Sequence, residues 1–192
     1  MTKRRMPALV VSLGLLALGC ESPIEDDLIE AQGPEVDGLE EGPLHRYGQD
    51  CFACHNGYGP GPEMAFAGTL FATPDENIPV EAATITITDA TGDTRATVSN
   101  CAGNFYVLKE SWDPVYPLRA EIECILPSDN PDVAPERRRN VMATRINRNG
   151  GCASCHSAGP ATADSVGQLY CSPEQPDPEF KRVAGCEGGP QN

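Results

Sequence analysis

Aromatic residues and basic residues are both scarce in this chain. Phe, Trp and Tyr make up 6% of the 192 residues, whereas 19 glycines and 18 prolines interrupt it, and this composition favours turns and short strands over long helices. Only 14 Lys and Arg accompany 28 Asp and Glu, so the formal net charge is −14. Such acidity argues against nucleic acids and anionic membrane surfaces as partners, and a cationic protein would be the better electrostatic match.

No apolar run in the sequence is long enough to span a bilayer comfortably. The apolar stretch 8–18 is short, follows three basic residues and ends at Leu18-Gly19-Cys20. A small residue directly before a cysteine resembles a bacterial lipoprotein signal, in which residues 1–19 are removed and Cys20 is lipidated. The alternatives are an ordinary signal peptide cut nearby and an uncleaved anchor. The lipoprotein interpretation predicts an exported protein, anchored to the membrane by its lipid in the periplasm or at the outer-membrane surface.

The middle of the chain shows the period-two alternation of β-strands. Residues 83–88 and 118–124 place apolar side chains on one face and polar ones on the other. Three further strands, separated by turn residues, are expected at 65–72, 94–100 and 104–109. Short strands at close spacing predict a mainly β fold, with a β-sandwich over residues 65–126.

The segments that flank this region are expected to be loop-rich. Residues 20–44 are acidic, lack aromatics and contain Pro and Gly, which predicts a disordered tether. Residues 127–160 begin as a Pro-rich, then basic connection, and the tail 161–192 is expected to be irregular. Within these segments we expect one more strand at 141–147 and short helical turns at 44–55 and 162–170.

The strand region also carries four short patterns of one known fold family. They are an opening strand, a second strand introduced by Pro, a D-x-x-G hairpin and a G-N-F turn, here Gly68-Thr69-Leu70, Ile78-Pro79-Val80, Asp89-Ala90-Thr91-Gly92 and Gly103-Asn104-Phe105. With them, residues 67–108 resemble the carboxypeptidase regulatory-like, or transthyretin-like, β-sandwich. The resemblance implies an immunoglobulin-like fold and no particular chemistry. The chain departs from the family at Cys101, which indicates an added disulfide.

One five-residue pattern occurs twice, nearly a hundred residues apart. The first pentapeptide, CFACH at 51–55, and the second pentapeptide, CASCH at 152–156, contain two of the only three histidines. Cys-x-x-Cys-His is the attachment signature of c-type haem. Two thiols at this spacing lie on one side of a helical turn and can add to two porphyrin vinyl groups, while the following imidazole binds iron. Chance predicts only about 0.006 such patterns in a chain of this composition, so the repeat is significant.

Both flanks of the repeat resemble attachment sites of small multihaem c-type cytochromes. The resemblance implies two covalently bound haem c groups, in segments 45–64 and 127–160. It also implies thioether bonds at four cysteines and proximal iron ligands at two histidines: Cys51, Cys54, Cys152, Cys155, His55 and His156.

Three other interpretations of the repeat remain open. The two CxxC pairs could hold one zinc ion as a four-thiolate site, although such a site needs no histidine. A thioredoxin-like redox motif would need a βαβ context, which the sequence lacks. Two local disulfides would leave both histidines unexplained.

The sequence offers three candidates for the sixth iron ligands. His45 could bind the first iron, reach across to the second, or be an ordinary surface histidine. Met64 and Met142 are weaker distal candidates, because methionine is more often a core residue, and open coordination at one iron is a further alternative. The basic run 137–139 is either a solvated loop or a partner for haem propionates.

The remaining cysteines suggest two disulfides. If Cys20 is lipidated and four cysteines hold haem, then Cys101, Cys124, Cys171 and Cys186 are left, an even number, as expected for an exported protein. Four cysteines allow three pairings, of which neighbourhood in the sequence favours Cys101–Cys124 and Cys171–Cys186.

The function that these features indicate is electron transfer by a dihaem cytochrome anchored to the cell envelope, with redox proteins as partners. The sequence shows no Ser-His-Asp set, no phosphate loop and no carboxylate pair in a recognisable pocket, so we expect an electron carrier rather than a catalyst, with no small-molecule substrate. The alternative is a surface binding or adhesion lipoprotein in which haem, or a four-cysteine zinc site, is structural.

Overall fold

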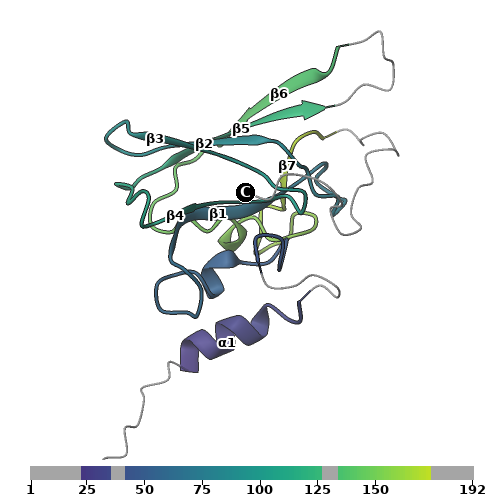
Figure 1. Ribbon diagram of the computed structural model, residues 1–192. Coiled ribbons are helices and arrows are strands. Elements are labelled where there is room, and N and C mark those ends of the chain that lie inside the picture. The colour runs from purple at the N-terminus through teal and green to yellow at the C-terminus, as the bar shows by residue number, and fades with distance from the viewer. Residues whose placement is uncertain (1–22, 36–41, 127–133, 174–192) are drawn as a thin grey trace, which may run out of the picture.

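A computed structural model describes residues 23–35, 42–126 and 134–173, and this part of the chain is mainly β, as predicted (Figure 1). The signal segment 1–19, Cys20 and Cys186 lie outside the described residues. The elements are helix α1 (Pro23–Ala31), the 3-10 turns η1 (Cys51–Ala53) and η2 (Cys152–Ser154), and strands β1 (Met64–Phe71), β2 (Thr84–Thr88), β3 (Thr94–Val98), β4 (Asn104–Leu108), β5 (Arg119–Leu126), β6 (Glu136–Val141) and β7 (Leu169–Tyr170). None of the described helices is long and apolar enough to cross a bilayer.

The strands form two sheets with a shared hydrophobic core (Figure 1). A three-stranded sheet has the order β4-β1-β7, and a four-stranded sheet has the order β3-β2-β5-β6. The pairing of β1 with β7 is parallel, and the other strand pairs are antiparallel. Phe66 and Phe105 enter the core from the first sheet, and Ile85, Leu118 and Ile122 enter it from the region of the second.

β1 is buried on both of its faces, whereas β2 alternates between buried isoleucines and half-buried threonines. Alternate β1 side chains point to opposite sides of the sheet. The side that carries Phe66 faces the core, and the other side is covered by the segment that leads into the first pentapeptide, since Thr69 accepts a hydrogen bond from the Gly48 amide at 2.8 Å. Strand β1 is therefore the structural link between the sandwich-like core and the pentapeptides.

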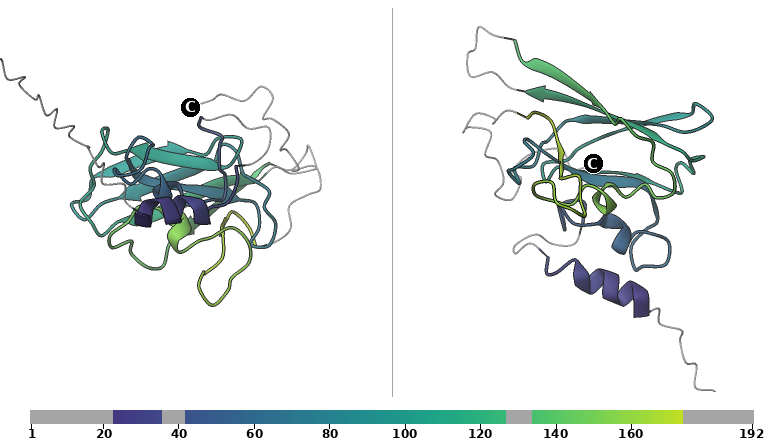
Figure 2. Two further views of the ribbon diagram at one scale, coloured as in Figure 1. Left: turned by 90° about the horizontal axis from the view of Figure 1, so that it is seen from below. Right: turned by 180° about the vertical axis from the view of Figure 1, so that it is seen from behind.

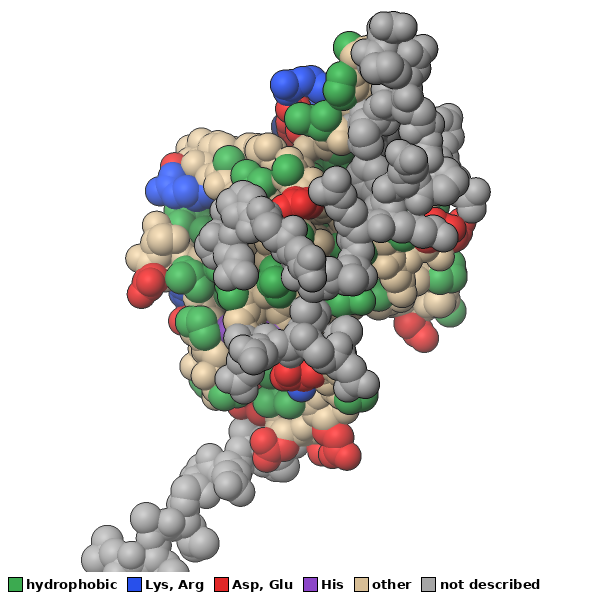
Figure 3. All heavy atoms as spheres, turned by 45° about the vertical axis from the view of Figure 1, so that its right-hand side comes forward, with side chains coloured by type: hydrophobic (Ala, Val, Ile, Leu, Met, Phe, Trp, Pro, Cys, Tyr) green, Lys and Arg blue, Asp and Glu red, His purple; other side chains and the backbone are tan. Residues whose placement is uncertain are grey.

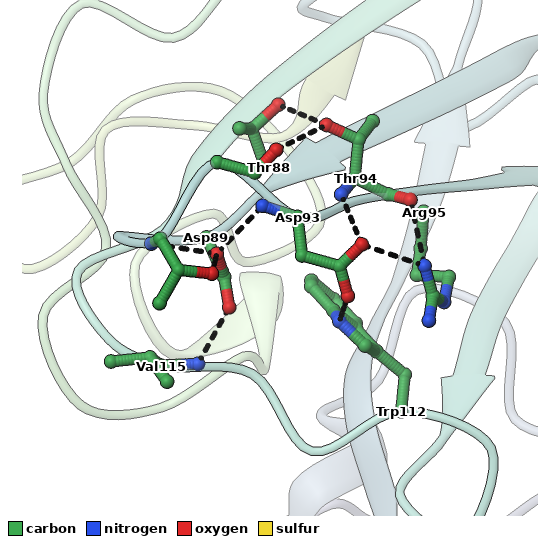
Figure 4. A network of polar contacts seen from close by, with 9 residues as sticks. Thr88, Asp89, Asp93, Thr94, Arg95, Trp112 and Val115 are labelled. Carbon is green, nitrogen blue, oxygen red and sulfur yellow. Dashed lines mark hydrogen bonds and ion pairs between the residues drawn. The ribbon is translucent and has the colours of Figure 1, made fainter.

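An Asp side chain closes the hairpin between β2 and β3 (Figure 4). One Asp89 oxygen accepts hydrogen bonds from the amides of Thr91 and Asp93 and from the Thr91 hydroxyl, and the other accepts from the Val115 amide. Gly92 adopts φ +90°, a conformation that favours glycine. The D-x-x-G pattern of the sequence therefore does form a hairpin.

The prediction of a strand at 141–147 is wrong. The edge strand lies earlier in the chain, in the basic segment that was expected to be a connection. β6 (Glu136–Val141) pairs with β5, whereas Ile146 makes only an isolated bridge with Leu118. Cross-strand ion pairs hold this edge: Arg137 pairs with Glu123 at 2.8 Å, and Arg139 pairs with Glu121. Charged pairs on neighbouring strands stabilise an edge strand that has no apolar alternation.

The prediction of a helical turn at 162–170 is also wrong, since this segment is extended and ends in β7. The buried Gln168 side chain explains the difference. Its amide nitrogen donates to the carbonyls of Thr73 and Glu76, and its oxygen accepts from the Gly159 amide. These bonds hold the segment against the chain that follows β1.

Residues 20–44 are not disordered throughout, because α1 (Pro23–Ala31) forms within them. The helix and the residues after it contact the segment of the first pentapeptide. Asn56 donates to Glu25 at 3.1 Å, the Asp50 amide donates to Gln32 at 2.9 Å, and Arg46 pairs with Glu35 at 3.0 Å. Polar contacts, which the composition of this stretch does not reveal, fix its conformation.

Both expected disulfide pairings are wrong. Cys124 of β5 is bonded to Cys171, directly after β7, with a Cα–Cα distance of 5.9 Å, so the bond joins the two sheets. Cys101 is also disulfide-bonded, and its partner lies outside the described residues. Neighbourhood in the sequence failed as a guide because the parallel pairing of β7 with β1 returns the tail to the core.

Candidate functional site

The two pentapeptides have almost the same backbone conformation. Each begins a 3-10 turn at its first cysteine, η1 in one case and η2 in the other. The residues before the turns, Asp50 and Gly151, have φ/ψ of −77°/103° and −75°/108°, and the second cysteines have −116°/−21° and −120°/−28°. In both, the histidine amide donates to the carbonyl of the first cysteine, at 2.9 Å and 2.8 Å. The repeat in the sequence is thus a repeat in structure.

The loops after the pentapeptides close in the same way although their lengths differ. The Cys54 carbonyl accepts from the Gly61 amide at 3.0 Å, and Nδ1 of His55 bonds to the carbonyl of the next residue, Pro62, at 2.8 Å. In the second loop, the Cys155 carbonyl accepts from the Val166 amide at 3.1 Å, and Nδ1 of His156 bonds to the Gly167 carbonyl at 3.0 Å.

These contacts fix the tautomer of both imidazoles. A carbonyl oxygen only accepts, so Nδ1 carries the proton and Nε2 has a free lone pair. No hydrogen bond reaches Nε2 of His55 or His156 from the described residues, and no buried side-chain nitrogen among them lacks a partner, so Nε2 of each ring is accessible. Metal-binding histidines usually donate their second ring nitrogen to a backbone carbonyl in this manner.

The fold brings the two pentapeptides together on one side of the three-stranded sheet (Figures 1 and 2). A Cβ atom on Gly151 would lie 2.9 Å from the Phe52 ring, so the first turn touches the start of the second. Gly151, the residue before η2, forms an isolated β-bridge with Ala67 of β1. The Ala67 amide donates to the carbonyl of the preceding residue, Gly150, at 3.1 Å. Chain segments a hundred residues apart therefore become neighbours.

The thiols do not resemble those of redox enzymes or of a zinc site. Burial, with a smaller contribution from Asp50, raises the pKa of Cys51 to about 12, and burial raises the pKa of Cys152 and Cys54 as well. A reactive dithiol needs the opposite shift. Within the described residues, which include all four pentapeptide cysteines, no three or more His, Cys, Asp or Glu side chains are grouped to hold a metal ion. The geometry gives no support to a four-thiolate zinc site.

A cavity of about 680 Å³ adjoins the second pentapeptide. This volume is within the range of about 300–1,000 Å³ that is typical of small-molecule and cofactor sites. Cys152, Cys155 and His156 lie in its wall. The cavity reaches the space between the sheets, and its apolar lining includes Phe66, Phe105, Ile122, Met142, Ile146 and Leu169. An apolar wall beside two thiols and an accessible imidazole nitrogen fits a porphyrin.

Two arginines outside the sequence motifs also line this cavity. Arg145 and Arg148 form no hydrogen bond or ion pair with any described residue. Arg137, Arg138 and Arg139, the run considered for propionates, bond to glutamates, and of these three only Arg139 also lines the cavity. The sequence feature that could have identified the two arginines is a stretch rich in arginine within an acidic chain. They are placed to pair with carboxylates of a ligand in the cavity.

The distal candidates occupy three different places. The His45 ring lies beside the His55 ring, with centroids 6.0 Å apart and planes inclined by 45°. Met142 lines the cavity beside the second pentapeptide. Met64 begins β1 directly after the first loop, where its amide donates to the His55 carbonyl at 3.0 Å. The structure thus brings His45 and Met64 to the first pentapeptide, Met64 as the first residue of a strand, and Met142 to the second.

Comparison with family models, with curated proteins and with solved structures finds no match for this chain.

Proposed function

We propose that this chain is a dihaem c-type cytochrome that transfers electrons at the cell envelope. The observation that carries the proposal is the pair of CxxCH segments, which fold alike and lie side by side with both Nε2 atoms accessible. Bound haem would supply reversible one-electron exchange at its iron.

The cysteines and histidines have separate tasks in this proposal. Cys51 and Cys54, and likewise Cys152 and Cys155, form the thioether bonds, so a thin apolar environment suffices to retain the group. His55 and His156 bind iron through Nε2, and the Pro62 and Gly167 carbonyls hold the rings in the correct tautomer. Arg145 and Arg148 neutralise propionates at the second site.

The contact between the pentapeptides supports electron exchange within one molecule. Phe52 touches Gly151, and a Cβ on Gly48 would lie 3.3 Å from Ala158 of the second segment. Two groups attached to such neighbouring turns share one side of the protein. With a haem bound at each pentapeptide, the two groups would exchange electrons within one molecule.

A structural role for haem is the second candidate, and one observation favours it. The cavity at the second pentapeptide is lined by the core residues Phe66, Phe105 and Ile122, so a group bound there would complete the packing between the sheets. A chain that uses haem only in this way would be a surface binding or adhesion module. Haems that are reduced and reoxidised reversibly in the folded protein would exclude that role.

Intact mass and absorbance of protein expressed with haem-maturation machinery test the proposal. We expect two covalent haems in the natural chain, one in C51A/C54A and one in C152A/C155A, each variant serving as the control for the other. Colourless protein with the mass of the bare polypeptide would refute the proposal.

Export and lipid anchoring are part of the proposal, although Cys20 lies outside the described residues. The Cys124–Cys171 disulfide supports export, because such bonds form in oxidising compartments. We expect the natural chain in the membrane fraction and C20A in the soluble extract of the envelope. A natural chain that fractionates as C20A does would exclude lipid anchoring at this residue.

A further inference from the structure

We infer that the two irons have different sixth ligands, His45 at the first pentapeptide and Met142 at the second. The inference rests on the proposed function, because it assigns residues to groups that the proposal places there. It goes beyond that function by giving the two sites unequal potentials, and hence a direction for electrons within the molecule.

Hydrogen bonds from buried side chains hold the backbone at His45 in place. The buried side chain of Asn104 donates to the carbonyls of His45 at 3.0 Å and Pro43 at 3.2 Å, and buried Asn100 donates to Pro43 at 2.7 Å. Thr69 of β1 donates to Asn104 at 2.8 Å. Buried polar side chains of β1, of β4 and of the turn before β4 therefore fix the backbone of this segment, unlike that of a histidine at the end of a solvated linker.

The His45 ring is oriented as the two proximal rings are. Its Nδ1 bonds to the Gly42 carbonyl, so Nε2 carries the free lone pair. A metal ion bound in line by two imidazoles, at about 2.0–2.1 Å from each nitrogen, places the ring centroids about 6–6.5 Å apart. The observed separation of His45 from His55 is 6.0 Å, and the inclination of 45° is compatible with two rings turned about a common axis.

The second site cannot use the same ligand. The chain has three histidines, and with His45 beside His55 none is left for the iron at His156. Met142 lines the same cavity as His156, and its backbone is held to the sheet, where its amide donates to the Ala120 carbonyl at 3.1 Å. Met64 does not line that cavity. Met142 is therefore the thioether available to the second iron.

Unequal ligands give unequal potentials. A Met/His pair raises the reduction potential of haem iron relative to two histidines. The first site is then the electron donor and the second site the acceptor within the molecule. Electrons would enter near α1 and the first loop and leave near the cavity bordered by Arg145 and Arg148.

The test uses the matured full chain, H45A, M142L and the matched control M64L, with haem number, redox titration and carbon monoxide binding as readouts. The natural chain should show two separate one-electron waves, bind no carbon monoxide when reduced, and show the weak red absorption band of methionine-ligated ferric haem. H45A should lose the low-potential wave and bind one carbon monoxide, and added imidazole should reverse this. M142L should lose the red band, bind one carbon monoxide and move the high-potential wave downward. M64L should behave as the natural chain does.

Several results would overturn the inference, and they differ from those that overturn the proposed function. Two results would exclude His45 as an iron ligand. One is two haems by mass with a single shared potential, and the other is H45A with unchanged redox waves and unchanged carbon monoxide binding. A natural chain that lacks the red band would exclude Met142 as a ligand, whether or not the variants fold, and a natural chain that binds carbon monoxide would show that one of the two proposed ligands is absent. Fewer than two haems by mass would instead refute the proposed function itself.

Discussion

At the scale of single residues, glycines allow the close approaches on which both candidate sites depend. A Cβ on Gly61 would lie 2.3 Å from two atoms of the His55 ring, and a Cβ on Gly68 would lie 2.8 Å from the Cys152 Cβ. Real Cβ atoms do not approach that closely, so the imidazole or the turn must move if either glycine is replaced.

Gly61→Ala should therefore impair the first site only. The added methyl group displaces the His55 ring, and overpacking of this kind costs about 1–3 kcal/mol. We expect intact mass to show a large loss of one haem and retention of the other. Gly68→Ala should show the complementary loss at the second site, and equal losses at both sites in either variant would contradict the assignment.

Asp89 gives the hairpin between β2 and β3 a predictable pH dependence. Hydrogen bonds from the Thr91 hydroxyl and then from the Val115 amide lower the pKa of Asp89 from 3.8 to about 2. Because the folded-state pKa lies below the unfolded one, this carboxylate stabilises the fold above about pH 4, and the stabilisation is lost as the pH falls towards 2.

The variant Asp89→Asn should lower the urea midpoint at pH 7, and the gap from the natural chain should close between about pH 4 and pH 2. Asp75→Asn, in an exposed position of a loop, is the matched control and should leave the midpoint unchanged at both pH values. A gap for Asp89→Asn that persists undiminished at the acid end would contradict this account.

At the scale of elements, the disulfide and strand β7 hold the second pentapeptide in place. Cys124 and Cys171 are 47 residues apart, and the loop that they close contains β6 and η2. Only two β7 residues pair with β1, so the pairing alone is a weak tie between the sheets. The disulfide supplies the strong link between the sheets that this short strand cannot provide.

C124A/C171A should lower the free energy of unfolding by about 4 kcal/mol, the loop-closure entropy of a cross-link across this many residues. Urea unfolding followed by circular dichroism would measure it. The haem count should fall at the second pentapeptide and not at the first, which lies outside the loop. An unchanged unfolding curve would show that β7 and the buried Gln168 suffice without the bond.

At the scale of the whole molecule, the acidic net charge would govern encounters with the redox partners that the proposed function requires. The chain has a formal net charge of −14, and on the face drawn in Figure 3 acidic side chains are spread over the surface while basic ones are few. A negative field attracts cationic proteins and repels anionic ones over distances set by the ionic strength.

Electron exchange with a basic redox protein should therefore slow by about tenfold or more as salt rises from low millimolar to a few hundred millimolar. Stopped-flow absorbance of the haems would follow the rate. An acidic redox protein of similar size is the control, and its rate should rise with salt. Rates that are independent of salt for both proteins would show that the partner docks on a patch shielded from the net charge.

Much of the fold and of the site was predictable from local pattern. The threonine–isoleucine alternation predicted β2, and the family resemblance at Asp89 and Gly92 implied its hairpin; both features depend on residues a few positions apart. The arginines of β6 misled the prediction, since their partners Glu121 and Glu123 lie on another strand. The place of α1 was likewise hidden, because its contacts are with residues near the first pentapeptide.

The sequence by itself determined the strand periodicity, the acidity and the two CxxCH patterns. The first and the last depend on residues close together in the chain, and the acidity depends on composition alone. Only the tertiary structure decided that the pentapeptides are neighbours, that His45 lies beside His55, that Arg145 and Arg148 line the cavity, and that Cys124 pairs with Cys171. The physical reason is the same in each case: these contacts join residues far apart in the chain. They form only because β1, buried between the core and the pentapeptide segments, has η1, η2 and β7 packed against it.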